Sequence, residues 1–292
     1  MKSGRKDNMK ISALMICMPH DEEYMAQCIQ SLLKLDHIVI TCPTKYMWQW
    51  RINKAEIKDQ DRTLEYIELM RKKHHGKIHT VFSEGWYSPN EQWRAGFDKM
   101  CELGYTDDDA FIISMPDEVW DDKELNKLIK LTKERKFNYS PDHLVFHGDF
   151  GWVGPGAEGR NYMFNRDMKL EAITKNAAFV YPSRPECEVR MGGANLAHDI
   201  KIHHFKWVHN LKHLEQKAEW NNQFYSKRPR ENPVDVINKW MNAKETTNVN
   251  MNLDASPMFT VPYKGAFPAI MKKHPYYGKD VKEILKYKGE YF

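Results

Sequence analysis

The sequence predicts an α/β fold with a mixed, mainly parallel sheet flanked by helices. Short apolar runs of strand length alternate with segments of helical periodicity over the first 120 residues. The runs lack the apolar–polar alternation of a half-exposed strand, as expected for strands covered on both faces. One run also ends abruptly in two carboxylates, and ligands of open α/β sheets bind outside the carboxyl ends of strands.

The first half of the chain supplies four predicted strands and four predicted helices. We expect the strands at residues 11–18, 37–41, 77–82 and 110–114. We expect the helices at residues 24–34, 46–57, 64–73 and 90–103. Strands and helices that alternate in this order indicate βαβ units and therefore a parallel sheet.

The second half is predicted to be an irregular lobe that continues the same domain. Helical patterns occur at residues 124–135, 213–225, 234–241 and 282–286. Strand-like runs occur at residues 144–147, 162–164, 177–181 and 200–207. Because no repeat or low-complexity linker interrupts the chain, we expect one domain over 1–292, with halves at 1–120 and 121–292.

Composition limits the class of protein. The 292 residues include 44 basic and 40 acidic side chains, and the net charge of +4 permits a polyanionic partner without requiring one. Five cysteines without a Cys-x-x-Cys pair favour reduced thiols over a disulfide framework. No apolar run reaches membrane-spanning length, and the polar start lacks the apolar core of a signal peptide. These features predict a cytoplasmic protein.

The strand expected at 110–114 is followed by Met115, Pro116, Asp117 and Glu118. Carboxylates at the carboxyl end of a strand are well placed to hold a hard divalent cation against a phosphorylated ligand. The structural alternative is that Asp117 caps the helix that begins near Asp121. Both interpretations remain open at this point.

Four segments in the correct order resemble family 2 glycosyltransferases with the GT-A fold. Their members typically open with a strand, Pro-x-x-Asn-Glu-Glu and a helix, and here Pro19, Glu22 and Glu23 follow the first strand. The similarity continues through 91–97, 115–118 and 202–207, and spans roughly residues 11–210. The resemblance implies a GT-A fold whose residues 1–120 bind a nucleotide-sugar and whose residues 121–292 form the acceptor half.

The resemblance also implies an activity and its ligands. It predicts transfer of a sugar from a nucleotide-sugar, first of all a UDP-sugar, to a hydroxyl of a saccharide or glycan. A divalent cation, Mn²⁺ or Mg²⁺, would stabilise the charge that develops on the leaving phosphate. The predicted metal ligands are Asp117, Glu118 and His204, because His203 would point to the opposite face of its strand. The predicted donor contacts are Thr41, Arg94 and Lys206.

Three positions depart from the family pattern, and one of them is His20, which stands where the family often has asparagine. Met115 replaces the first carboxylate of the Asp-x-Asp motif, and Thr41 stands near where relatives place an aspartate that reads the nucleobase. An inverting transfer needs a general base for the acceptor hydroxyl. Glu186 and Glu188, which follow an apolar run, are the predicted candidates. The equally open alternative is that these two carboxylates lie in a surface loop and have no catalytic role.

Two other functions compete with transfer to a saccharide. A DNA acceptor with a hydroxymethylated pyrimidine is suggested by basic clusters that alternate with tyrosines, such as Lys272-Lys273-His274 and 279–288. A solvated face is the ordinary explanation for such clusters. A sugar-nucleotide-binding protein without catalysis is suggested by Met115. A nucleotidyltransferase is disfavoured, because the glycine-rich, arginine-containing loop expected after the first strand is absent.

Overall fold

The structure is a computed structural model of the whole chain. It describes residues 9–46, 56–57, 61–106, 109–135, 139–155, 163–164, 195–224, 235, 238, 241 and 260–291. The chain divides into two compact units. Unit 1 comprises 1–142 and 159–201, and unit 2 comprises 143–158 and 202–292. Two of the three unit boundaries fall within strands, one in β6 (Tyr139–His147) and one in β9 (Asn195–Trp207).

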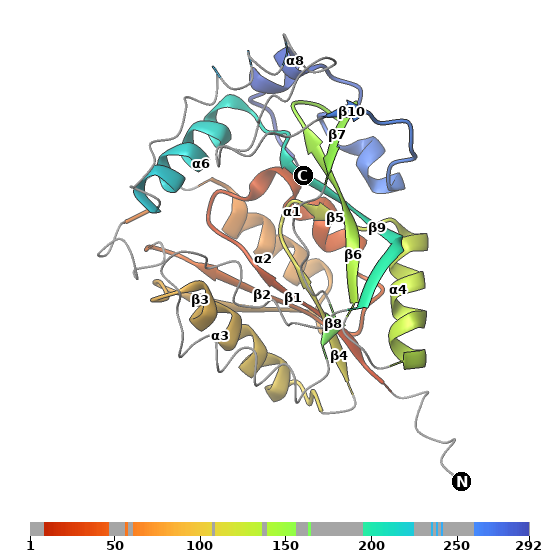
Figure 1. Cartoon of the computed structure of the whole chain (residues 1–292). Coiled ribbons are helices and arrows are strands. Elements are labelled where there is room, and N and C mark those ends of the chain that lie inside the picture. Colours follow the sequence, from red (N-terminus) through yellow and green to blue (C-terminus); the bar gives the residue numbers. More distant parts are fainter. Residues whose placement is uncertain are drawn as a thin grey trace. The chain divides into compact units, whose positions relative to one another are not determined.

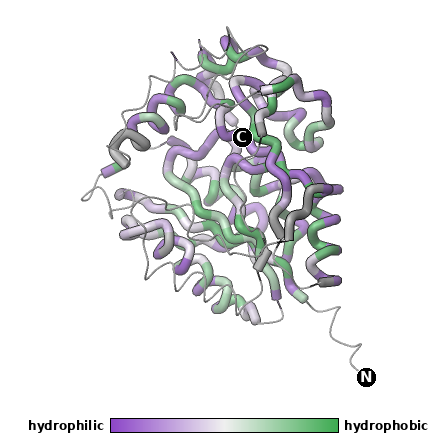
Figure 2. Tube along the Cα trace, viewed as in Figure 1, coloured by the Kyte–Doolittle hydropathy of each residue, from purple (hydrophilic) through white to green (hydrophobic). Residues whose placement is uncertain are grey.

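Unit 1 is built on a five-stranded sheet of order β3-β2-β1-β4-β8 (Figure 1). Its strands are β1 (Ile11–Ile16), β2 (Ile38–Pro43), β3 (Ile78–Ser83), β4 (Ala110–Ser114) and β8 (Met163–Phe164). The first four run parallel, and β8 pairs antiparallel with β4. Every residue of β1, β2 and β4 is buried, which explains their continuous apolar pattern (Figure 2). The predicted fold class is confirmed.

In the described part of unit 1, four helices accompany the strands. They are α1 (Glu22–Ser31), α2 (Thr63–Lys73), α3 (Pro89–Glu102) and α4 (Asp122–Arg135). In Figure 1, α3 lies on one side of the sheet and α1 and α2 on the other. Gly96 lets α3 approach closely, since an added Cβ would overlap Leu14 Cδ1 and lie 2.9 Å from Thr41 Cγ2. The helix is well capped, because the Ser88 hydroxyl accepts the Glu91 N–H and Pro89 occupies the first turn.

The sequence-based prediction of elements fails in a few places. The helix expected at 46–57 is wrong at its ends, because Tyr46 and Glu56 form an isolated antiparallel bridge; residues 47–55 lie outside the described residues. The short strand β5 (Glu118–Val119) was not expected. β6 and β9 begin about five residues before their predicted starts. The strand expected at 177–181 lies outside the described residues.

Unit 2 contains a second sheet in which β10 (Val261–Pro262), β7 (Trp152–Pro155), β6 and β9 are successive neighbours. β7 pairs antiparallel with both β6 and β10. The helices described in this unit are α6 (Leu211–Phe224), the 3-10 helix η2 (Ala269–Lys273) and α8 (Val281–Leu285). An apolar cluster joins these elements: Val145, Trp152, Trp207, Leu214 and Val281. Among the described residues, no helix has the length and apolar character needed to span a membrane.

Candidate functional site

The carboxyl ends of β1, β2 and β4 form one edge of the unit 1 sheet, because these strands are parallel and in register. The segment that follows β4 makes a tight turn at this edge. The Glu118 N–H donates to the Met115 carbonyl at 3.1 Å, and Glu118 Oε2 accepts the Met115 N–H at 2.9 Å. Glu118 is fully buried. Its carboxylate therefore closes the turn that presents Asp117.

Asp117 is half-buried at this turn, in contrast to Glu118. The structural alternative for Asp117 was a cap on α4, but Asp121 Oδ1 makes that bond by accepting the Lys123 N–H at 2.8 Å. A half-buried carboxylate at the carboxyl edge offers hard oxygen ligands, which suit Mg²⁺ and Mn²⁺. The donor chemistry of Asp117 thus fits a divalent cation, while its role as a ligand stays a prediction.

Two side chains of helix α1 form hydrogen bonds with the backbone of this turn. The Cys28 thiol donates to the Met115 carbonyl at 3.1 Å, and the Ser31 hydroxyl accepts the Trp120 N–H at 3.2 Å. Burial raises the pKa of the Cys28 thiol well above its ordinary value, and the negative charges of Glu118 and Asp117 raise it further. Cys28 is therefore a neutral packing residue that fixes the position of the carboxylates.

Gln92 joins the carboxyl ends of β1 and β2. It is completely buried on α3, and its Nε2 donates to the carbonyls of Cys17 at 3.1 Å and Thr41 at 2.8 Å. The Thr41 hydroxyl, predicted to contact the nucleobase, is buried and donates to the Met15 carbonyl at 3.3 Å. Sequence reasoning missed Gln92, although a polar residue on the apolar face of a predicted helix is a usable signal.

A second group of carboxylates lies at the starts of α1 and α2. Asp61 Oδ2 accepts the Glu22 N–H at 3.1 Å, and Asp61 Oδ1 accepts the Thr63 N–H at 2.7 Å. Glu22 Oε2 in turn accepts the Arg62 N–H at 3.1 Å. Asp21 does not cap α1, because its carboxylate accepts the Met18 N–H instead. Asp61 thus serves the first turns of α1 and α2 together.

The protonation of Asp61 reflects its burial. Desolvation raises the pKa of this carboxyl from 3.8 to about 7, and the charge of Glu22 adds to the rise, although hydrogen bonds from Thr63 and Glu22 oppose it. A carboxyl with such a pKa exchanges its proton near neutral pH. An acidic residue shortly before a helical pattern is a typical helix-start signal, so the role of Asp61 at the start of α2 could be read from the sequence.

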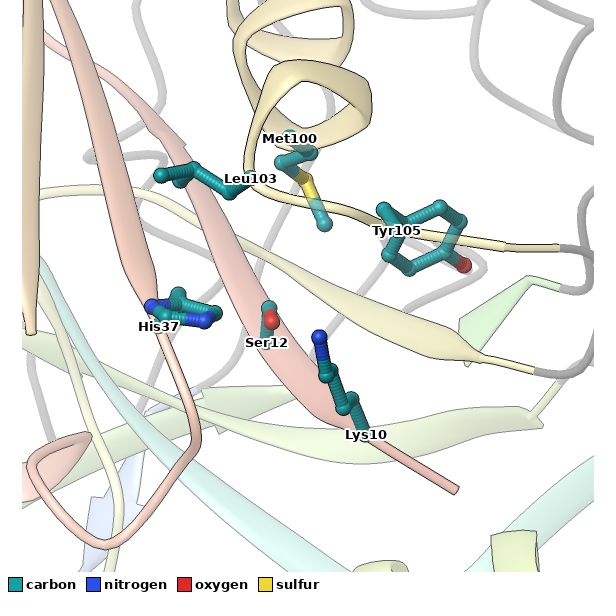
Figure 3. A pocket seen from close by; sticks show the side chains of 6 residues that line it. All are labelled: Lys10, Ser12, His37, Met100, Leu103 and Tyr105. Atoms are coloured by element: carbon teal, nitrogen blue, oxygen red, sulfur yellow. The ribbon is translucent and has the colours of Figure 1, made fainter. Parts of the chain in front are cut away.

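Arg94, the predicted donor contact on α3, is exposed. Its side chain is accessible to a ligand, and its role stays a prediction. The small pocket in Figure 3 lies at the opposite, amino edge of the sheet, because Lys10 and His37 precede β1 and β2. It is lined by Lys10, Ser12, His37, Met100, Leu103 and Tyr105. This pocket is therefore separate from the carboxylates that follow β1 and β4.

In unit 2, consecutive histidines of β9 point to opposite faces, as predicted. His203 stacks on Phe146 with ring centroids 5.8 Å apart, and its Nε2 lies 3.1 Å from the Tyr263 hydroxyl. His204 lies beside His143, with 3.4 Å between their Nδ1 atoms. Both histidines of this second pair are buried. The metal role predicted for His204 stays a prediction.

Unit 2 carries a lysine and a buried histidine, Lys206 and His147, where unit 1 carries carboxylates. Lys206 is half-buried, with its Nζ 5.7 Å from the Trp207 ring centroid. His147 is fully buried, and neither of its ring nitrogens makes a hydrogen bond with the described residues. Desolvation lowers the pKa of His147 from 6.5 to about 3, and the nearby charges of Lys206 and His204 contribute to the decrease. His147 is therefore neutral at physiological pH.

The two predicted general bases, Glu186 and Glu188, lie outside the described residues. Their role stays a prediction from the sequence.

The sequence matches no protein-family model and no curated protein. Among solved structures, S. aureus TarS residues 1–349 align with 79% of this chain and 66% of their own length, at 12% identity and a TM-score of 0.42. The full TarS structure is covered over only 40% of its length. A 4-diphosphocytidyl-2C-methyl-D-erythritol synthase aligns over 65% of this chain and 90% of its own, at 11% identity and a TM-score of 0.39.

Proposed function

We propose that the protein is a metal-dependent glycosyltransferase that moves a sugar from a nucleotide-sugar to a hydroxyl of a saccharide or glycan. The observation that carries the proposal is the turn after β4. There a buried Glu118 shapes the backbone, and the half-buried Asp117 occupies the carboxyl edge of a parallel sheet. Ligands of open α/β sheets bind at this edge. Function is argued from these residues because one fold serves many chemistries.

Each residue has a distinct part in the proposed reaction. Asp117 binds the divalent cation, and Glu118 fixes the turn on which Asp117 lies. When bound, the cation supplies positive charge to the diphosphate that leaves. Arg94 provides a second cationic group for the donor, whereas Thr41 is buried and supports the strand ends from within the sheet. UDP-sugars are the first donors to test, because the family resemblance points to them.

The acceptor side is assigned to the second half of the chain. Glu186 or Glu188 takes the proton from the acceptor hydroxyl as the new glycosidic bond forms. His204 and Lys206 are proposed to act on the phosphate side of the donor. A DNA acceptor is the second candidate, favoured by the exposed lysines between residues 264 and 288. Such an enzyme needs its target base extruded from the duplex.

The test is nucleotide release from a panel of UDP-, GDP-, CDP- and TDP-sugars in the presence of Mn²⁺. We expect release from one donor that stops when the metal is chelated. Asp117→Asn removes the charge of the proposed ligand, so release should fall about 100-fold or more, which corresponds to about 2.7 kcal/mol of transition-state stabilisation.

Asp122→Asn is the matched control, because Asp122 is a nearby carboxylate whose side chain is 83% exposed and pairs with Lys34. It should retain wild-type release. Donor binding without any release would support a binding protein that lacks catalysis. Release of pyrophosphate from a nucleoside triphosphate would indicate a nucleotidyltransferase. Equal activity of Asp117→Asn and Asp122→Asn would contradict the proposed metal site.

A further inference from the structure

The C-terminal segment of unit 2, residues 260–291, packs its apolar and aromatic side chains against one another and against the rest of unit 2. The hydroxyls of Tyr276 and Tyr291 lie 2.9 Å apart, and Asn210 Nδ2 donates to the Tyr291 hydroxyl at 2.7 Å. The side chains that point inward are Met271, Tyr276, Val281, Ile284 and Tyr291. These buried side chains and hydrogen bonds hold the backbone of the segment in place, and its polar side chains extend from that backbone.

This segment is strongly basic. It contains seven lysines and three acidic residues, an excess of 7 − 3 = 4 positive charges that equals the net charge of the whole chain. Six of the lysines are exposed, and none of the six makes an ion pair with the described residues: Lys264, Lys272, Lys273, Lys282, Lys286 and Lys288. Asp280 and Glu283 are engaged with each other's backbone in a capping box. We call the six lysines the lysine surface.

A polyanion fits this surface by charge, and the arrangement of apolar groups distinguishes between kinds of polyanion. A helix that binds a membrane surface needs an exposed apolar face. Helix α8 has only five residues, and its Val281 and Ile284 are buried. Nucleic acids instead require cations for their phosphates and exposed aromatic rings for their bases.

Tyr277 supplies such a ring. It is 41% exposed, and its ring is held edge-on against Phe267 and Phe150 at centroid distances of 5.8 and 6.2 Å. An aromatic side chain that is fixed in place loses little conformational freedom when a base stacks on it. The Lys279 ammonium lies 4.3 Å from the Tyr287 ring centroid, so that lysine is already used within the segment.

We propose that the lysine surface binds nucleic acid through its backbone phosphates, with Tyr277 stacking on an unpaired base. The binding needs no sugar transfer, so it goes beyond the proposed function. If both proposals hold, unit 2 is the part of the chain that binds the nucleic acid.

The test uses fluorescence anisotropy with labelled 20-nucleotide single-stranded and duplex DNA between 50 and 200 mM NaCl. We expect the full-length protein to bind single-stranded DNA more tightly, with an affinity that decreases steeply with salt. The combined change Lys272→Gln, Lys273→Gln and Lys282→Gln should weaken binding at least about 10-fold and reduce the salt slope by about 2. Tyr277→Ala should weaken binding of single strands about 5- to 100-fold, and Tyr277→Phe should restore it.

The matched control removes three exposed lysines from α4: Lys123→Gln, Lys130→Gln and Lys133→Gln. This variant has the same net charge as the test variant and should bind DNA like the wild type. Equal losses in both triple variants would overturn the proposal, because they would show a net-charge effect. Binding to phosphatidylserine vesicles without binding to DNA would also overturn it. Circular dichroism of each variant verifies folding, and donor release without DNA tests the glycosyltransferase separately.

Discussion

The two units of the chain place their ionisable side chains differently. In unit 1, the central strands β1, β2 and β4 are apolar and buried, and carboxylates such as Asp117 and Glu118 follow where β4 ends. In unit 2, imidazoles stand within the strands themselves, as with His147 on β6 and His204 on β9. The first arrangement gathers negative charge at one sheet edge. The second packs aromatic and histidine rings against each other.

Burial has opposite consequences for the titration of the two units. It raises the pKa of Asp61 in unit 1 and lowers the pKa of His147 in unit 2. In both cases the interior favours the uncharged form, because desolvation penalises the charge. Desolvation should therefore lower the free energy of unfolding through Asp61 of unit 1 as the pH rises, and through His147 of unit 2 as the pH falls.

The largest expected effect concerns His147. Its folded pKa of about 3 lies below the unfolded value of 6.5, so the unfolded chain binds a proton first as the solution is acidified. The free energy of unfolding should therefore decrease by about 2 kcal/mol between pH 7 and pH 5, and by about 4 to 5 kcal/mol by pH 3. Urea titrations at several pH values measure this decrease.

His147→Leu removes the titrating ring, so its unfolding free energy should lack that part of the acid dependence. His75→Leu, which changes an exposed histidine, is the matched control and should keep the wild-type slope. If His147→Leu and the wild type lose stability in parallel, the imidazole is not held neutral by burial.

The effect expected for Asp61 has the opposite sign. Its folded pKa of about 7 lies above the unfolded value of 3.8, so its contribution to stability is complete below pH 3.8 and is lost as the pH rises through 7. The loss should reach about 4 kcal/mol, of which about 2 kcal/mol falls between pH 5 and pH 7. Difference measurements between the wild type and Asp61→Asn isolate it.

Asparagine has one side-chain oxygen and cannot accept both N–H donors that Asp61 Oδ1 and Oδ2 serve, so Asp61→Asn also changes the absolute stability. The informative quantity is therefore the slope of the unfolding free energy against pH. Asp122→Asn again provides an exposed control. If the unfolding free energy of Asp61→Asn kept the wild-type dependence on pH, the contrast between the units would be contradicted.

The smallest effect concerns the packing of α3 on the unit 1 sheet. Glycine to alanine within a helix ordinarily stabilises it by about 1 kcal/mol. At Gly96 the new Cβ would overlap buried Leu14, and overpacking of this kind costs about 1–3 kcal/mol. Gly96→Ala should therefore lower the free energy of unfolding, whereas Asp98→Ala on the exposed side of α3 should not. A more stable Gly96→Ala would show that α3 approaches the sheet less closely.

The sequence predicted the parts of unit 1 that follow from local pattern. β1, β2 and β4 were recognisable because strands buried on both faces are continuously apolar. The turn at Asp117 could be placed because it directly follows β4. The opposite orientations of His203 and His204 followed from the period of two in a strand.

Other features depend on contacts between distant segments. Asp61 acts on Glu22, 39 positions away, and Gln92 bridges carbonyls 75 and 51 positions away, so no local window contains these bonds. Tyr46 pairs with Glu56 although helical periodicity favoured a helix there. The early starts of β6 and β9 were also missed, since Pro141 and Asp142 in β6 and His198 and Asp199 in β9 interrupt the apolar pattern.

The central claim is that the carboxyl edge of the unit 1 sheet holds a divalent cation through Asp117. Titration of Mn²⁺ followed by electron paramagnetic resonance, with UDP present, tests it most directly. We predict that Asp117→Asn weakens Mn²⁺ binding at least about 10-fold, or about 1.4 kcal/mol, while Asp122→Asn binds as the wild type does. Equal Mn²⁺ affinity in all three proteins would contradict the account.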